Sequence, residues 1–253
     1  MFVLLAVLAL VIGVFIGTVG IGGILLIPAL SVFLGLSTHV SMATALFSFL
    51  FTGIAGTCLY QRHGSIDWHI TVPVCVGAVL FAYLGALVNS RADVLFLRNL
   101  LSLVIIFAGV YTLRPWRQTR KLQYDPKSRS QRNLLLGIGA SVGFASGLTG
   151  TGGPVLSVPI MMIFGFAPLT TIATSQVLQI AIGLSGSVGN MVHGQIDFYS
   201  GFWVTVLELA GVMIGVRLAH RANAQQLRRC VAILCIIVGV FILCSPLLRL
   251  GVR

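Results

Sequence analysis

Two glycine-rich stretches carry the residues of this sequence whose types and spacing are best suited to chemistry. They read "GTVGIGG" (17–23) and "GLTGTGG" (147–153), and each lies in an apolar run and precedes a short apolar segment that contains proline. Glycine tolerates positive φ and lets the backbone approach a ligand closely. The first amides of a helix that follows such a break are unpaired and lie at the positive end of the helix dipole. We therefore expect two matching interruptions whose amides hold a small anion between them.

Close helix packing is the alternative explanation for these glycines. Gly13 with Gly17, and Gly143 with Gly147, form the GxxxG spacing that lets membrane helices approach each other. We assign packing to these outer pairs. The inner GxGG clusters, each followed by a short helix, are interpreted as breaks.

Hydroxyl side chains recur in the apolar segment that follows each short segment. "SMATALFS" (41–48) matches "TIATSQVL" (171–178), and hydroxyls can line an anion site as neutral donors. Serine and threonine in membrane helices also bond back to their own carbonyls, which is the alternative. Gln176 and Gln179 occur only in the second stretch and would make the site asymmetric and selective. The full set of predicted binding residues is Gly20, Gly22, Gly23, Ser41, Thr44, Thr149, Gly150, Thr151, Gly152, Gly153, Thr171, Thr174, Ser175, Gln176 and Gln179.

Glu208 is a carboxylate deep inside an apolar segment, "FWVTVLELAGVMIG" (202–215). An ionised carboxylate near the bilayer centre is costly, so such a group is protonated, paired or in contact with water. One interpretation is a proton-coupling site that loads a proton with each substrate anion. The other is a structural role, either a hydrogen bond between helices or a pairing with Arg217.

Two His and Asp pairs have the i, i+4 spacing that could hold a metal on one helix. They are His63 with Asp67 and His193 with Asp197, in "HGSID" and "HGQID". Each Asp directly precedes an apolar segment, so we interpret it as a helix N-cap. The sequence thus predicts no metal site and no cofactor. The five cysteines form no CxxC pair and are expected to be buried, reduced thiols.

The composition indicates that the helices carrying these residues lie in a lipid bilayer. Of the 253 residues, 57% are hydrophobic and 8% are charged, with a mean hydropathy of +1.04. A soluble domain of this size needs more surface charge. Uncharged apolar runs of about 20 residues, the length of a helical membrane crossing, recur along the chain. We predict an all-α polytopic membrane protein whose main partner is the lipid bilayer.

A basic stretch lies in the middle of the chain. Seven of the sixteen Lys and Arg residues fall within 114–132, as the positive-inside rule expects of a cytoplasmic loop. Topology therefore explains the net charge of +11, and no nucleic-acid partner is needed.

The chain matches itself without gaps at an offset of 130 residues, as in duplicated proteins. Gly20, Gly22 and Gly23 fall on Gly150, Gly152 and Gly153, and "HGSID" falls on "HGQID". We predict an N-terminal transmembrane repeat (1–113), a basic cytoplasmic linker (114–132) and a C-terminal transmembrane repeat (133–253). The apolar segments are expected at 1–18, 24–36, 39–61, 68–90, 94–113, 133–148, 154–166, 168–191, 198–219 and 226–245.

The second segment of each repeat is too short to cross a bilayer unaided, at about 20 Å. If it counts as a crossing, each repeat has five crossings and the repeats are inverted. If it is re-entrant, each repeat has four and the repeats run parallel. The distribution of Lys and Arg favours inverted repeats with Gly-rich broken or re-entrant helices.

The chain resembles the sulfite exporter TauE/SafE family, also called the toluene sulfonate uptake permease family. The resemblance rests on "GIGGILLIP" (20–28) and "GTGGPVLSVP" (150–159), on the "AT" that follows each, and on "G-x-I-D" before the next segment. It covers nearly the whole chain. Ala45 stands where many members repeat the serine seen at Ser175, and the first GxGG lacks a third consecutive glycine. The resemblance implies transport of small sulfur-containing anions such as sulfite or organosulfonates across a bacterial inner membrane.

Three classes of function remain to be compared. A secondary transporter for small anions is the leading hypothesis, because paired Gly/Pro-interrupted segments mark the binding sites of such proteins. An anion channel, or a transporter of another small anionic metabolite, is the alternative. An intramembrane enzyme is disfavoured, since the sequence has no HExxH motif and no Ser/His set at membrane depth. The sequence also leaves a homodimer open.

Overall fold

The computed structural model describes residues 2–113, 128–221, 233 and 236–244. Most of the predicted linker and most of the last predicted segment, 226–245, lie outside these residues. Every assigned element is helical. In chain order the elements are α1 (Phe2–Val19), the short 3-10 helix η1 (Gly22–Leu25), α2 (Leu26–Leu34), α3 (Thr38–Arg62), α4 (Trp68–Arg91), α5 (Val94–Leu113), α6 (Arg129–Thr149), α7 (Pro154–Ile163), α8 (Pro168–His193) and α9 (Phe198–Arg221).

Five of these helices, α3, α4, α5, α8 and α9, are long and apolar enough to cross a bilayer. Large apolar side chains such as Val76 and Leu80 of α4 are more than 60% exposed on the outside of the bundle. In water such a surface would be unstable, whereas lipid tails solvate it. The chain is a multi-pass membrane protein.

The Asp residues of the two His and Asp pairs act as helix N-caps, as predicted. The Asp67 carboxylate accepts a hydrogen bond from the His69 amide at the start of α4. Asp197 accepts from the amide and hydroxyl of Ser200 at the start of α9. In the described part of the chain, no three His, Cys, Asp or Glu side chains gather as a metal site would require.

The expectation of buried cysteines is wrong for two of the three that the structure describes. Cys58, Cys75 and Cys244 are free thiols, but Cys58 and Cys244 are exposed on helix surfaces. An apolar run predicts membrane depth, and at that depth a thiol can face lipid as readily as protein. Cys230 and Cys235 lie outside the described residues.

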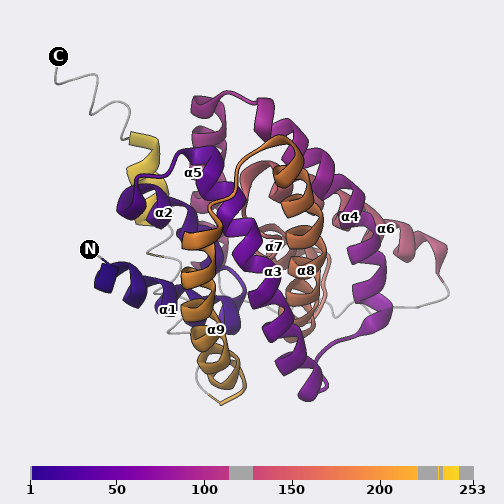
Figure 1. Cartoon of the computed structure of the whole chain (residues 1–253). Coiled ribbons are helices and arrows are strands. Elements are labelled where there is room, and N and C mark those ends of the chain that lie inside the picture. The colour runs from indigo at the N-terminus through magenta and orange to yellow at the C-terminus, as the bar shows by residue number, and fades with distance from the viewer. Residues whose placement is uncertain (1, 114–127, 222–232, 234–235, 245–253) are drawn as a thin grey trace.

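The equivalent helices α3 and α8 cross at the centre of the molecule and run antiparallel (Figure 1). A Cβ built on Gly53 would lie 3.1 Å from the backbone of Gln176 and Ile180, and one on Gly183 would lie 2.9 Å from Leu50. As the residue number rises along one helix, it falls along the other. Glycine at these contacts lets the two backbones approach closely.

Each half of the chain packs its first helix on the other half. Helix α1 packs along α9, and α6 packs along α4, which are the same pair of contacts in the predicted repeats (Figure 1). A Cβ on Gly17 would lie 2.6 Å from the carbonyl oxygen of Val212, and Gly147 meets the equivalent carbonyl of Ala82. The outer GxxxG glycines thus serve helix packing, as expected.

Substituting a packing glycine should destabilise the bundle. A Cβ on Gly143 would lie 2.5 Å from the Ala78 carbonyl oxygen, whereas Gly137 of the same helix has no atom within 4 Å. We expect Gly143→Val to lower stability by about 1–3 kcal/mol through overpacking, and Gly137→Val to have little effect. Thermal unfolding in detergent measures both. Equal melting temperatures for the two variants would contradict this account of the interface.

Candidate functional site

Both glycine-rich stretches interrupt a helix. Helix α1 ends at Val19, Gly20 has φ of 81°, and a regular α-helix resumes only at Leu26. Helix α6 ends at Thr149, and α7 begins at Pro154. Between them Gly150, Gly152 and Gly153 have φ of 71°, 75° and 103°. An L side chain rarely adopts these angles, so the sequence motif follows directly from the backbone.

Gly22 and Gly23 of the first GxGG cluster do not have positive φ and serve close contacts instead. A Cβ on Gly22 would overlap the Phe15 side chain of α1. One on Gly23 would lie 2.8 Å from the ring of Phe49. The first break therefore folds back on α1 more tightly than the second break does on α6.

The structure brings the two breaks together. A Cβ on Gly20 would lie 3.4 Å from the Cβ of Pro154, the first residue of α7, and 3.3 Å from the Ser175 hydroxyl. The ring of Phe49 lies against both breaks, because a Cβ on either Gly23 or Gly152 would overlap it. Phe49 is fully buried. The predicted meeting of the two stretches is thus present, with an aromatic ring at the junction.

Side chains from other helices donate to carbonyls near the two breaks, including that of Ile16, which also accepts from the Gly20 amide. Gln176 donates to the carbonyl of Ile16 at 3.1 Å, and Tyr60 donates to that of Gly17 at 2.8 Å. At the second break Asn89 donates to the carbonyl of Leu148 at 2.6 Å. Unpaired backbone inside a membrane persists only where protein or a watery cavity surrounds it. Here side chains satisfy at least one carbonyl beside each break.

The donor side of the second break is open. Among the described residues, the amides of Thr151, Gly152 and Gly153 donate to no backbone carbonyl. These amides lie at the N-terminus of α7, where the helix dipole favours negative charge. The second break can therefore donate several hydrogen bonds to an anion.

Three of the predicted hydroxyls bond between segments. Thr174 and Thr71 share a hydrogen bond of 2.9 Å, Thr44 accepts from the Asp197 amide at 3.0 Å, and Ser41 pairs with Ser31 at 3.1 Å. The Ser41 and Thr44 hydroxyls, which share a helix face, thus have different partners.

Three of the other four hydroxyls of the predicted set bond to their own helices, as the alternative interpretation held. Thr149 donates to Ala145, Thr171 to Ala167 and Ser175 to Ile172. Thr149 also pairs with Thr151 at 3.1 Å, and Thr151 donates to Ser146. Ser175 nevertheless lies beside the first break, because its hydroxyl oxygen would be 3.3 Å from a Cβ on Gly20.

The two glutamines form contacts between helices and keep one free acceptor each. Gln179 donates to the Thr52 hydroxyl at 2.8 Å, and Gln176 donates to α1 as described above. The side-chain oxygens of both glutamines are buried and have no hydrogen-bond partner. A buried polar atom without a partner is unfavourable and is common at binding sites.

Glu208 lies at the interface of α9 with α1 and α3 and is fully buried. One carboxylate oxygen accepts a hydrogen bond from the Ser48 hydroxyl of α3, and the other has no partner among the residues that the structure describes. Glu208 therefore forms the hydrogen bond between helices that we gave as its possible structural role, with Ser48 as the partner. A proton-coupling role stays a prediction.

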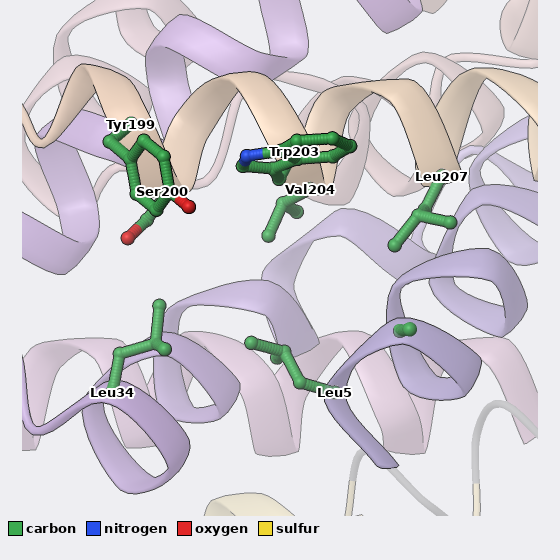
Figure 2. A pocket seen from close by; sticks show the side chains of 8 residues that line it. Leu5, Leu34, Tyr199, Ser200, Trp203, Val204 and Leu207 are labelled. Carbon is green, nitrogen blue, oxygen red and sulfur yellow. The ribbon is translucent and has the colours of Figure 1, made fainter. Parts of the chain in front are cut away.

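Two cavities open elsewhere in the molecule. The larger, about 340 Å³, is an apolar groove between α1, α2 and α9 that is lined by residues such as Leu5, Leu34 and Trp203 (Figure 2). The smaller, about 170 Å³, is polar and lies where α3 begins and where α4 and α8 end. None of the predicted binding residues lines either cavity, and all of them are buried. This conformation is closed at the breaks.

Comparison with known proteins decides the family. The model of the family described as "Sulfite exporter TauE/SafE" matches residues 4–242. The chain belongs to the sulfite exporter TauE/SafE family. It is 28% identical to the probable membrane transporter protein YunE of Bacillus subtilis, with 96% of each chain covered. It is also 23% identical to the probable membrane transporter protein YdhB of the same organism. That match covers 91% of this chain and 96% of the relative.

An archaeal relative extends the comparison. A probable membrane transporter protein of Methanocaldococcus jannaschii is 22% identical over 96% of this chain and 97% of its own length. No solved structure matches the chain. Together the family and these relatives indicate that this TauE/SafE member is a membrane transporter.

Sequence reasoning missed three residues that contact the breaks or Glu208 in this TauE/SafE member. They are Phe49, Ser48 and Asn89, and none is matched by a residue of the same polarity in the other half. At the offset of 130 their counterparts are Gln179, Leu178 and Ala219. A search for positions at which the two halves differ in polarity would have singled them out.

Proposed function

We propose that this protein is a secondary transporter that moves small sulfur-containing anions, such as sulfite or organosulfonates, across the bacterial inner membrane. The anion binds between the two breaks, where the amides of residues 151–153 and neighbouring hydroxyls donate to it. The family supports the choice of substrate class. The observation that carries the site is the meeting of Gly20 with Pro154 and Ser175, which brings the two interrupted segments into contact.

The two halves are proposed to be inverted repeats around this site. The antiparallel crossing of α3 and α8 supports this arrangement, because equivalent helices of parallel repeats would run in the same direction. The exchanged contacts of α1 with α9 and of α6 with α4 also support it. Alternating access then follows if one repeat moves against the other and opens the breaks to each side in turn.

Proton coupling is proposed to run through Glu208. Ser48, its partner, lies one helical turn before Thr52, which bonds Gln179 of α8. Polar contacts therefore link the carboxylate on α9 to α3 and to the helix that carries the Thr174 and Ser175 hydroxyls. Protonation of Glu208 would change its bond to Ser48 and, through α3, the position of the breaks.

Uptake into proteoliposomes tests the proposal. Labelled sulfite, thiosulfate, sulfoacetate and taurine are offered with and without a pH gradient. We expect at least one sulfur-containing anion to enter. Its uptake should be faster when the pH is lower outside the liposomes than inside. If none enters while an unrelated neutral solute does, the anion assignment fails. A current larger than proton-coupled anion transport at a fixed stoichiometry could carry would instead identify a channel.

Removal of the hydroxyl at Thr174 should slow transport. Thr174→Val removes the hydroxyl that pairs with Thr71 of α4 and that precedes Ser175, the residue beside the first break, so we expect uptake to fall by about tenfold, the equivalent of one hydrogen bond. Thr174→Ser should retain most activity. Thr205→Val is the matched control, because the Thr205 hydroxyl bonds only to its own helix. A Thr174→Val protein with wild-type uptake would remove this residue from the site.

A further inference from the structure

The polar cavity of about 170 Å³ is unusual in a chain with so much apolar surface. It lies where α3 begins and where α4 and α8 end. None of the residues that line it is acidic, so nothing in its wall repels an anion. Its polar lining consists of Ser37, His39, Asn89, Ser90, Asn190 and Gln195.

The floor of this cavity is connected to the second break. Asn89 is 2% exposed, and its carboxamide oxygen lies 3.3 Å from Nδ1 of His39. Its amide nitrogen donates to the carbonyl of Leu148, two residues before Gly150, and contacts the sulfur of Met42. A Cβ on Gly150 would lie 2.6 Å from the Cβ of Met42. Asn89 and Met42 thus form a single layer of side chains between the cavity and the break.

The chemistry of the lining suits a small oxyanion. Hydroxyls, carboxamides and an imidazole can all donate hydrogen bonds, and the imidazole can add positive charge. An anion held here would already have exchanged part of its hydration for protein donors before it reached the buried amides. Such a stepwise exchange avoids a single large desolvation cost.

The lining is only partly repeated at the first break, where Ser90 and Gln195 correspond to the polar residues His220 and Ser65. At the offset of 130, Ser37, His39 and Asn89 are replaced by Ala167, Leu169 and Ala219. Asn190 corresponds to Tyr60, which is fully buried and caps Gly17. The lining residues therefore differ between the two ends of the bundle and give the two access routes different chemistry.

We propose that this cavity is an access subsite, where a small oxyanion such as a sulfonate binds before Asn89 and Met42 part and admit it to the second break. The choice of ligand class rests on the proposed function, but binding at this subsite can be measured without transport. Because the lining differs between the two ends, the subsite also makes capture of substrate favour one side of the membrane.

A protection experiment on the detergent-solubilised full-length protein tests the subsite. In a background with the five cysteines replaced, Gln195→Cys places a thiol at the cavity, and Ser65→Cys places a control thiol beyond the opposite end of α3. Methanesulfonate is the probe. At a concentration of about ten times Kd it should slow modification of the Gln195→Cys thiol by about tenfold, and leave the Ser65→Cys thiol unaffected.

Substitutions at His39 separate an electrostatic role from a structural one. We expect methanesulfonate affinity in the protection assay to fall in the order His39→Lys, His39→Gln, His39→Glu, with about a tenfold loss between the first and the last. In proteoliposomes the apparent KM should follow the same order while the maximal rate changes little. A structural role would not rank the variants by charge. His69→Gln, at the other end of α4, is the control.

The outcomes distinguish this subsite from the transport proposal. No protection of the Gln195→Cys thiol, or equal affinity in all three His39 variants, would overturn the subsite even if the wild-type protein transports sulfonates. Protection with the expected charge order, together with no transport of any sulfur-containing anion, would keep the subsite and overturn the transport proposal.

Discussion

Gly152→Ala is expected to reduce anion transport by about a hundredfold, since displacement of a binding group by about 1 Å can cost that much. Gly152 has φ of 75°, which is unfavourable for alanine, and the new Cβ would overlap the ring of Phe49. Both effects displace the amides of residues 151–153, which we propose as the anion donors. Initial rates of labelled sulfonate uptake measure the loss, and size-exclusion profiles show that the protein remains folded.

Two further variants separate the causes. Gly64→Ala introduces alanine at φ of 65° in a turn with no atom within 4 Å of its Cβ, so it tests backbone strain alone. Gly23→Ala introduces a contact with Phe49 without positive φ, so it tests the ring contact alone. We expect normal transport for Gly64→Ala and a large loss for Gly23→Ala. Wild-type rates for Gly152→Ala would contradict the proposed site.

Glu208→Gln is expected to uncouple transport from the pH gradient. Glutamine can still accept the Ser48 hydrogen bond, but it cannot carry a proton. With a gradient of about one pH unit, electroneutral symport of a monovalent sulfonate with one proton accumulates it about tenfold. The variant should accumulate none, while exchange of labelled for unlabelled sulfonate across the membrane continues.

A surface carboxylate provides the control for this prediction. Asp93 is exposed and caps the start of α5, and asparagine caps nearly as well as aspartate. Asp93→Asn should therefore keep both accumulation and exchange. Gradient-driven accumulation by Glu208→Gln at the wild-type level would exclude Glu208 as the coupling group, and loss of exchange as well would assign it a structural role.

The breaks could be predicted from the sequence because backbone geometry dictates residue type there. Gly150, Gly152 and Gly153 all have positive φ, and only glycine adopts such angles without strain. The duplication reinforced the signal, since two matched clusters are harder to explain by chance than one. The bounds of the apolar helices followed from hydropathy and from caps such as Asp67 for the same reason, because local chemistry decides them.

The contacts that complete the site could not be predicted, because they join residues far apart in the chain. Ser48 bonds Glu208 across 160 residues, and its repeat counterpart is apolar, so no local pattern marks it. Thr171 and Thr174 belong to one repeated motif, yet Thr171 bonds its own helix while Thr174 bonds Thr71 of α4. Only the packing of the helices decides between these two outcomes.

Anomalous X-ray scattering at the selenium edge, from crystals of the unlabelled protein grown with selenite in place of sulfite, locates the bound anion. We expect a selenium peak between the two breaks, with its oxygens about 3 Å from the amides of residues 151–153 and Gly20 on the facing side. A bound selenium elsewhere in the bundle, with none between the breaks, would contradict the proposed site.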